Sequence, residues 1–134
     1  MEAFFSGLAT HLSSVYNTEV GTPTFSPGIN LFVGRLPDDP ARAVALLLSS
    51  TLKNPHEVIN KPEFELVTRD SKGREGYCFS THKRMYDILK GAGNPVSECK
   101  GLIRPLEELA GSGYDKQERP LYISRFVFWA GELV

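Results

Sequence analysis

The sequence predicts an α+β domain in which two helices pack on one face of a mainly antiparallel sheet of four to five strands. Two segments, residues 2–17 and 75–90, have the apolar spacing of amphipathic helices. Several shorter segments alternate apolar and polar residues or are rich in β-branched and aromatic residues. The predicted order of elements is α-β-β-β-α-β-β, which indicates an α+β fold.

Composition indicates one soluble globular domain over residues 1–134. A chain of this length buries about two-thirds of its unfolded surface. The hydrophobic content of 41% and the charged content of 23% are ordinary for such a protein. The net charge of −1 gives no overall attraction to nucleic acid or to anionic lipid, although local basic patches are compatible with it.

The first residues, MEAFFSGLATHL, lack the basic region and the long apolar core of a signal peptide. No segment approaches the length of a membrane span. We therefore expect an intracellular protein without membrane contact, in which Cys78 and Cys99 are free thiols.

The first helix is predicted over residues 2–17 because apolar residues recur there at spacings of one, three and four. On this assignment His11 and Ser13 face solvent. The predicted buried stripe comprises Phe4, Phe5, Leu8, Leu12, Val15 and Tyr16.

Three strands are predicted between the helices. Residues 29–35 alternate as a strand does, and residues 62–69 alternate as a half-buried strand does. Residues 41–50 are almost continuously apolar, and their length and flanking turns favour a buried strand over a short helix. A polar corner, Leu36-Pro37-Asp38-Asp39-Pro40, separates the first two strands.

The second helix is predicted over residues 75–90, and Gly91 and Gly93 supply its stop. Its apolar stripe follows the spacing of one helix face. The predicted stripe comprises Tyr77, Cys78, Thr81, Met85, Ile88 and Leu89. The side chains predicted to face solvent are His82, Lys83, Asp87 and Lys90.

Two further strands are predicted after this helix, over residues 101–110 and 120–129, with a flexible turn at 111–115. Pro105 cannot donate a ladder hydrogen bond, which indicates an edge strand or a bulge. The last strand is apolar on both faces, so it should be central in the sheet or contact another subunit. Arg125 interrupts one of these faces and needs a partner inside the domain or across an interface.

Asp38 and Asp39 are adjacent carboxylates on a turn, a pair that can bind a cation or act in acid–base chemistry. Neither a histidine nor a third acid stands near them at the spacing of a ligand set. We therefore interpret the pair as turn chemistry, in which Asp39 caps the segment that starts at Pro40.

The other reactive residue types show no catalytic pattern. His11, His56 and His82 lack the spacing of a zinc site, and Cys78 lies on an apolar helix stripe, which is typical of a core residue. The sequence has neither a GxSxG elbow nor a glycine-rich phosphate loop. We therefore expect no enzymatic activity, no metal and no cofactor.

Basic residues cluster between the third predicted strand and the second helix, with acidic residues among them. One interpretation is a solvated surface of mixed charge, and the other is ion pairing with an acidic neighbouring subunit. The cluster comprises Arg69, Lys72, Arg74, Lys83 and Arg84.

An ordered set of short motifs extends over nearly the whole chain. It comprises Leu36-Pro37-Asp38-Asp39-Pro40, Ala43-Val44-Ala45-Leu46, Val67-Thr68-Arg69-Asp70, Ile88-Leu89-Lys90-Gly91, Ile103-Arg104-Pro105-Leu106 and the aromatic residues 126–129. In this order the motifs resemble those of the phage minor capsid proteins that act as tail terminators, also called tail completion or head–tail joining proteins, of long-tailed phages.

The resemblance implies a structural virion protein that forms a ring, a hexamer in relatives, on the last ring of the tail tube. Such a protein stops tube polymerisation and offers a surface to the head connector or completion protein. The implied partners are therefore further copies of the chain, the tail tube protein and the connector, after assembly in the host cytoplasm. The residues that we expect at its interfaces are Arg35, Pro37, Asp38, Asp39, Arg42, Arg69, Arg74 and Arg125, together with the loop at 53–61.

Two alternatives remain at this point. One keeps the phage context and makes the protein a head-completion or connector adaptor. The other is a small ligand-binding or enzymatic α+β domain that uses Cys78 or the Asp38-Asp39 pair.

Overall fold

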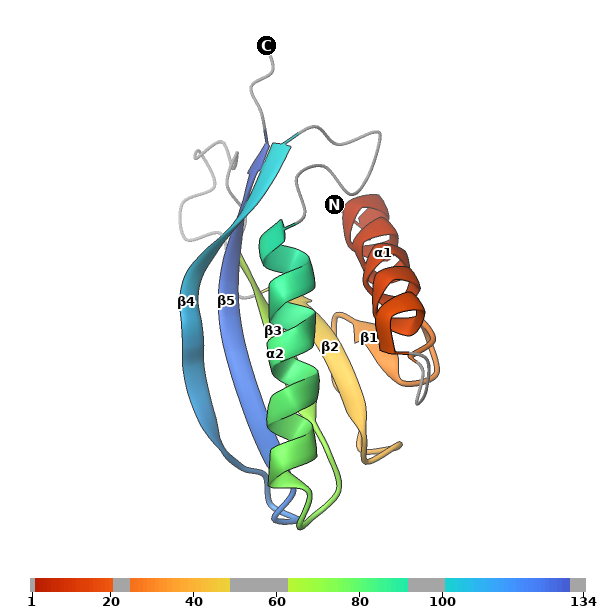
Figure 1. Cartoon of the computed structure of the whole chain (residues 1–134), viewed down its shortest axis with the longest axis vertical. Helices are drawn as coiled ribbons and strands as arrows, with labels where there is room; N and C mark the ends of the chain where they lie inside the picture. Colours follow the sequence, from red (N-terminus) through yellow and green to blue (C-terminus); the bar gives the residue numbers. More distant parts are fainter. Residues whose placement is uncertain (1, 21–24, 49–62, 92–100, 131–134) are drawn as a thin grey trace.

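The computed structural model describes residues 2–20, 25–48, 63–91 and 101–130 (Figure 1). Five strands lie side by side in the order β1-β2-β3-β5-β4. Only β1 and β2 are parallel, and the other neighbouring pairs are antiparallel. The predicted α+β class and the mainly antiparallel sheet are confirmed. In chain order the elements are α1 (Glu2–Val20), β1 (Leu31–Val33), β2 (Ala43–Leu48), β3 (Glu63–Arg69), α2 (Glu75–Gly91), β4 (Gly101–Tyr114) and β5 (Pro120–Ala130).

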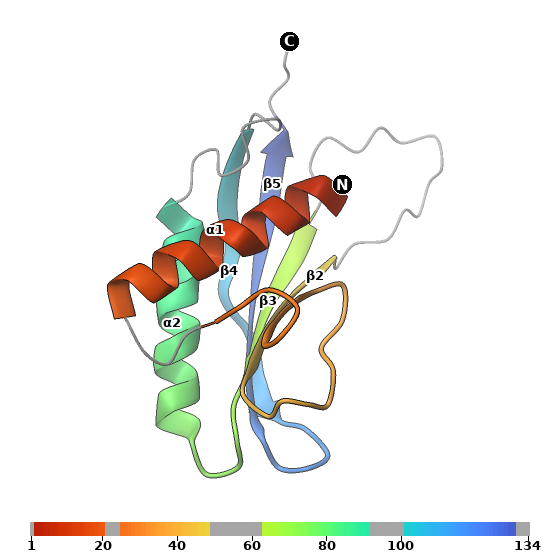
Figure 2. The ribbon, with the colours of Figure 1, turned by 90° about the vertical axis from the view of Figure 1, so that its right-hand side faces the viewer.

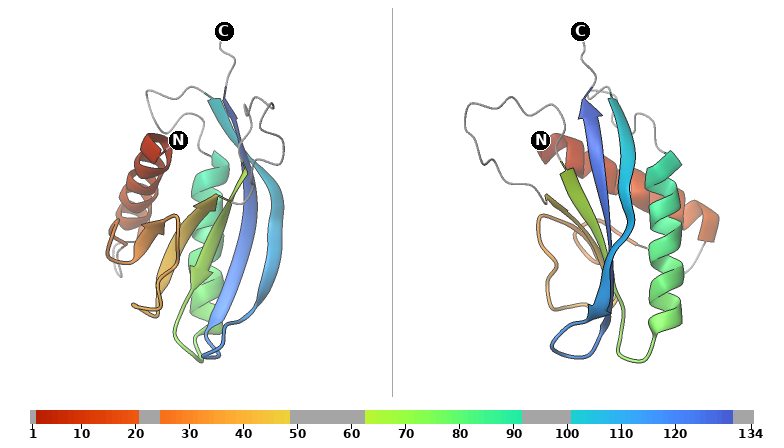
Figure 3. Two further views of the ribbon diagram at one scale, coloured as in Figure 1. Left: turned by 180° about the vertical axis from the view of Figure 1, so that it is seen from behind. Right: turned by 90° about the vertical axis from the view of Figure 1, so that its left-hand side faces the viewer.

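Both helices cover the same face of the sheet, which we call the helix face (Figures 1 and 2). Helix α2 runs along β3, β5 and β4, while α1 crosses beside α2 and reaches β1. The opposite face carries neither of the described helices (Figure 3). Neither helix combines the length and the hydropathy that a membrane span requires.

Aromatic side chains join the two layers in the core. Phe5 of α1 packs edge-on against Phe64 of β3, with ring centroids 5.4 Å apart. Phe64 stacks on Phe126 of β5, and Phe126 also contacts Tyr86 of α2. Aromatic pairs in these arrangements add to the free energy of burial, so this chain of rings fixes both helices to the centre of the sheet.

Strand β5 lies between β3 and β4, as its apolar character on both faces predicts. Strand β4 is an edge strand with register shifts between Pro105 and Glu107 and between Glu107 and Gly111. The interpretation of Pro105 as the mark of an edge or a bulge is therefore confirmed.

The flexible turn predicted at 111–115 is wrong, because β4 continues to Tyr114. Gly111 pairs with Ile123, and Tyr114 pairs with Pro120. The reversal follows at residues 115–119, where the Asp115 carboxylate accepts hydrogen bonds from the backbone amides of Gln117 and Arg119. Glycine is typical of turns, but Gly111 and Gly113 lie in a strand just after a bulge, where glycine is also common.

Three side-chain assignments on the helices are also corrected. Ser13 and His82 were predicted to face solvent, but both are buried, and Tyr77 of the predicted stripe is exposed. His82 takes its place beneath α2 because two hydroxyl groups of the sheet supply its polar partners. A polar residue is tolerated in a core when its hydrogen bonds are satisfied, and helical periodicity alone does not reveal this.

Candidate functional site

The candidate site is the corner segment, residues 34–42, which joins the parallel strands β1 and β2. It starts at Gly34, whose φ of 94° favours glycine, and it contains a cis peptide bond between Asp39 and Pro40. It lies on the side of the sheet away from α2 (Figures 2 and 3). Because the segment lies between two strands and outside the sheet ladder, its backbone carbonyls need other hydrogen-bond donors.

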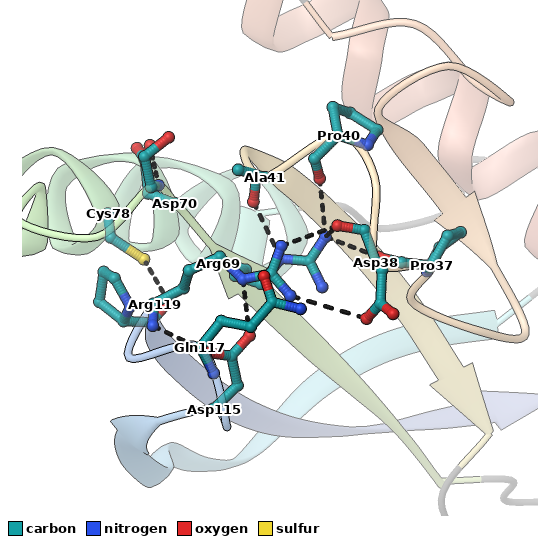
Figure 4. A network of polar contacts seen from close by, with 12 residues as sticks. Pro37, Asp38, Pro40, Ala41, Arg69, Asp70, Cys78, Asp115, Gln117 and Arg119 are labelled. Carbon is teal, nitrogen blue, oxygen red and sulfur yellow. Dashed lines mark hydrogen bonds and ion pairs between the residues drawn. The ribbon is translucent and has the colours of Figure 1, made fainter.

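Arg69, the last residue of β3, supplies most of these partners (Figure 4). Its Nε donates to the carbonyl of Ala41 at 2.9 Å. Its Nη2 donates to the carbonyls of Pro37 at 2.6 Å, Pro40 at 2.7 Å and Asp38 at 3.3 Å. One buried guanidinium thus gathers four carbonyls of the corner segment.

Burial lowers the pKa of Arg69 from its ordinary value, and the nearby positive charge of Arg119 lowers it further. A guanidinium nevertheless stays protonated at neutral pH. The carbonyl dipoles therefore surround a permanent charge, and charge-assisted hydrogen bonds are stronger than neutral ones.

Arg119, from the turn between β4 and β5, is the second anchor. Its Nη1 donates to the carbonyl of Asp38 at 2.7 Å, and its Nε donates to the Asp115 carboxylate at 2.8 Å. Like Arg69 it is buried. Arg119 was not among the predicted site residues, because 81 positions separate it from Asp38 and no local pattern connects the two.

The anchored corner segment presents an acidic tip to solvent. The side chain of Asp38 is 84% exposed, although one of its oxygens lies 3.6 Å from Arg119. Asp39 and Arg35 are exposed, and Pro37 is half-buried. No three histidine, cysteine or acidic residues of the described chain are placed to hold a metal ion.

The other predicted interface residues occupy different places. Arg69 is buried, so it cannot contact a neighbouring subunit directly and can affect an interface only by ordering the corner segment. Arg42, the last residue of the corner segment, and Arg74, just before α2, both approach the buried carboxylate of Asp70. The loop at 53–61 falls outside the described residues, as do His56 and Cys99.

Arg125 lies on the face of β5 opposite the helices. The strand register pairs it directly with Glu65 of β3. Opposite charges at directly paired positions stabilise a sheet, so the structure favours partners within the domain.

We expect Arg125→Ala to lower the free energy of unfolding by about 0.5–1.5 kcal/mol, because it leaves the paired Glu65 without its cross-strand cation. Denaturant unfolding measures this change, with the exposed Arg35→Ala as the control, expected within about 0.5 kcal/mol of the parent. Unchanged stability together with lost assembly would instead place the partner of Arg125 on another subunit.

A second polar group lies buried beneath α2. His82 Nδ1 is 2.8 Å from Thr68 Oγ1, and its Nε2 is 2.6 Å from Ser124 Oγ. Burial lowers the pKa of His82 to about 4, so the ring is neutral at pH 7, with one nitrogen donating and the other accepting. The group tethers α2 to β3 and β5.

Cys78 is a free and fully buried thiol. Burial raises its pKa to about 12, and the negative charge of Asp70 acts in the same direction. Because the thiolate is the reactive form of cysteine, this residue is unsuited to nucleophilic attack at neutral pH. Its position on the apolar side of α2 is as predicted.

Taken together, the fold and the site define a two-layer α+β domain that presents an acidic corner anchored by two buried arginines. Neither a protein-family model nor a curated protein sequence matches the chain.

Proposed function

We propose that the protein is a tail terminator, a structural virion protein that caps the phage tail tube as a ring and joins the tail to the head. Two supports carry the proposal. One is the ordered set of motifs that resembles this family. The other is the distribution of exposed apolar side chains along the two edges of the sheet.

Both edges of the sheet expose large apolar residues. Ile29 and Val33, beside and within β1, are 67% and 40% exposed. Leu106 and Leu109 of β4, on the far edge, are 47% and 48% exposed. Exposed strand edges invite pairing with another chain, and two different surfaces in contact generate a ring when the rotation closes.

This distribution is the observation that best supports a ring. A subunit whose two edges contact different neighbours forms head-to-tail contacts, which suits a hexameric cap on a six-fold tube. The corner segment then lies outside the strand-to-strand contact, available to a neighbouring subunit, to the tail tube protein or to the head connector.

The enzymatic alternative draws less support from the geometry. The thiol of Cys78 is buried on the sheet-facing side of α2 and is protonated at neutral pH. The backbone of Asp38 is held by Arg69 and Arg119, in an arrangement that orders a surface segment.

Electron microscopy of tail tubes incubated with the purified protein tests the proposal. We expect a six-fold cap at one tube end, and we expect the double variant Leu106→Asp/Leu109→Asp to fold but to form no cap. Lys116→Asp, in the exposed β4–β5 turn, serves as the control and should still cap. Density at the head connector would instead favour the adaptor, and absence of the protein from purified virions would contradict both phage functions.

A further inference from the structure

A groove of about 430 Å³ opens between the end of α1, the start of β2 and the first turns of α2. Three arginines from different elements line it, Arg42, Arg74 and Arg84, so we call it the arginine groove. Tyr77 lines it as well, and Glu19 is the acidic residue among its described lining. Three of its eight described lining residues therefore carry positive charge, and two tyrosines, a serine and a threonine add hydroxyl groups.

The positive charge of the groove is only partly neutralised. Arg42 and Arg74 share a single buried carboxylate, that of Asp70, with Nε–oxygen distances of 3.9 Å and 3.3 Å. Arg84 pairs with Glu19 at 3.0 Å. Three guanidinium groups against two carboxylates leave a net charge of +1.

The Arg84–Glu19 pair is easily exchanged for another. Both side chains are about half exposed, 47% and 48%, and exposed ion pairs contribute little to stability. An incoming carboxylate therefore takes the place of Glu19 at little cost. Arg84 is the groove arginine most available to a partner.

The remaining two guanidinium groups are already ordered. The Arg42 guanidinium lies 4.2 Å from the centroid of the Phe25 ring and donates to the Tyr16 hydroxyl. The Arg74 guanidinium lies 4.1 Å from the Tyr77 ring centroid. Side chains held in this way lose less conformational entropy when they bind an anion.

The chain itself presents a complementary group. Asp38 and Asp39 are adjacent and exposed at the tip of the corner segment. That tip is held by Arg69 and Arg119 on the face of the sheet away from the helices, whereas the arginine groove lies on the helix side. The acidic tip and the arginine groove are therefore two different surfaces of one subunit, as the two sides of a head-to-tail contact must be.

We propose that the arginine groove of one subunit binds the Asp38 and Asp39 carboxylates of a second copy of the chain. The proposal rests on the ring-forming function proposed above and adds a polar contact between neighbouring subunits to the contact of their sheet edges. Arginine and carboxylate groups form paired, directional hydrogen bonds, which sets the rotation between neighbours as well as their affinity. Because the two surfaces differ, a pair of bound subunits still has one free groove and one free acidic tip, so the same contact can add further subunits.

Charge reversal on each side tests the contact. We expect self-association that weakens as salt is added. Asp38→Lys/Asp39→Lys and Arg74→Glu/Arg84→Glu should each weaken it by about tenfold or more. An equal mixture of the two variants should restore association, because the lysine tip of one then meets the glutamate groove of the other. Sedimentation equilibrium measures all of these, with Lys116→Glu as the matched control and circular dichroism as the check of folding.

Several results would overturn the proposal. The parent chain could stay monomeric up to the concentrations of an NMR sample. The charge reversals could leave association unchanged, or the equal mixture of the two variants could fail to restore association. Inorganic phosphate is the competing anion. If it binds the groove while the Asp38→Lys/Asp39→Lys variant associates normally, the groove is a phosphate site.

The test is separable from that of the proposed function. If the parent chain caps tail tubes and the charge reversals change neither capping nor association, the inference fails and the tail-terminator function stands. If the parent chain associates through these surfaces but caps no tube, the contact stands and the tail-terminator function fails.

Discussion

Arg69→Met is expected to lower the free energy of unfolding by about 3–5 kcal/mol, because several carbonyls of the corner segment lose a charged donor at once. Methionine fills much of the volume of arginine but donates no hydrogen bond. The carbonyls of Pro37, Asp38, Pro40 and Ala41 would lose their shared donor. Each unsatisfied buried carbonyl costs about 1–3 kcal/mol, and solvent that enters the released segment recovers part of this.

Two measurements separate a released corner segment from a general loss of stability. Denaturant unfolding gives the total change, and hydrogen exchange at residues 34–42 shows whether this segment opens before the rest. Arg35→Met is the matched control, because Arg35 lies in the same segment but is exposed, and a change within about 0.5 kcal/mol is expected. A loss below about 1 kcal/mol for Arg69→Met would show that the corner segment is held by other contacts.

Both helices and β3 lie close to their predicted positions, because apolar spacing reports which face of an element is buried. Strands β2 and β5 also lie close to theirs, and there the length of the apolar run, its flanking turns and its β-branched and aromatic content indicated a strand. Pro105 also carried its own signal, since a residue without an amide hydrogen has few places in a sheet.

The contacts that anchor the corner segment could not be predicted from local periodicity. Sequence indicated a turn at Leu36–Pro40, but the partners of its carbonyls come from the end of β3 and from the β4–β5 turn. Arg69 was interpreted as part of a charged surface cluster, whereas its guanidinium is buried. A pairing across 81 residues depends on tertiary topology, and a single sequence contains no periodicity that reports it.

His82 shows the same limit on a helix. A histidine between Thr81 and Lys83 looks like part of a solvated face, yet it lies one turn before Met85 and Tyr86 on the buried side of α2. Its polar partners, Thr68 and Ser124, sit on strands that precede and follow the helix in the chain. Only their positions on the helix face of the sheet make the burial of this ring favourable.

The buried ring of His82 should make stability fall as the solution becomes acidic. Its pKa is about 4 in the folded protein, against an ordinary value of 6.5, so the unfolded chain takes up the proton first. The contribution of the neutral ring is fully present above pH 6.5 and is lost as the pH falls from 6.5 through about 4. At 1.36 kcal/mol per pH unit, this lowers the free energy of unfolding by about 3 kcal/mol at the acidic limit.

Carboxylates also titrate in this range, so the informative quantity is the difference between the parent chain and His82→Gln. Glutamine keeps a hydrogen-bonding group near Ser124 but does not titrate. We expect the variant to be less stable at pH 7 and to lose less stability on acidification. His11→Gln, on a half-buried position of α1, is the control for replacing a histidine elsewhere in the chain. An NMR titration that gave His82 a pKa above 6 would contradict the prediction, because the ring would then gain a proton in the folded state as readily as in the unfolded one.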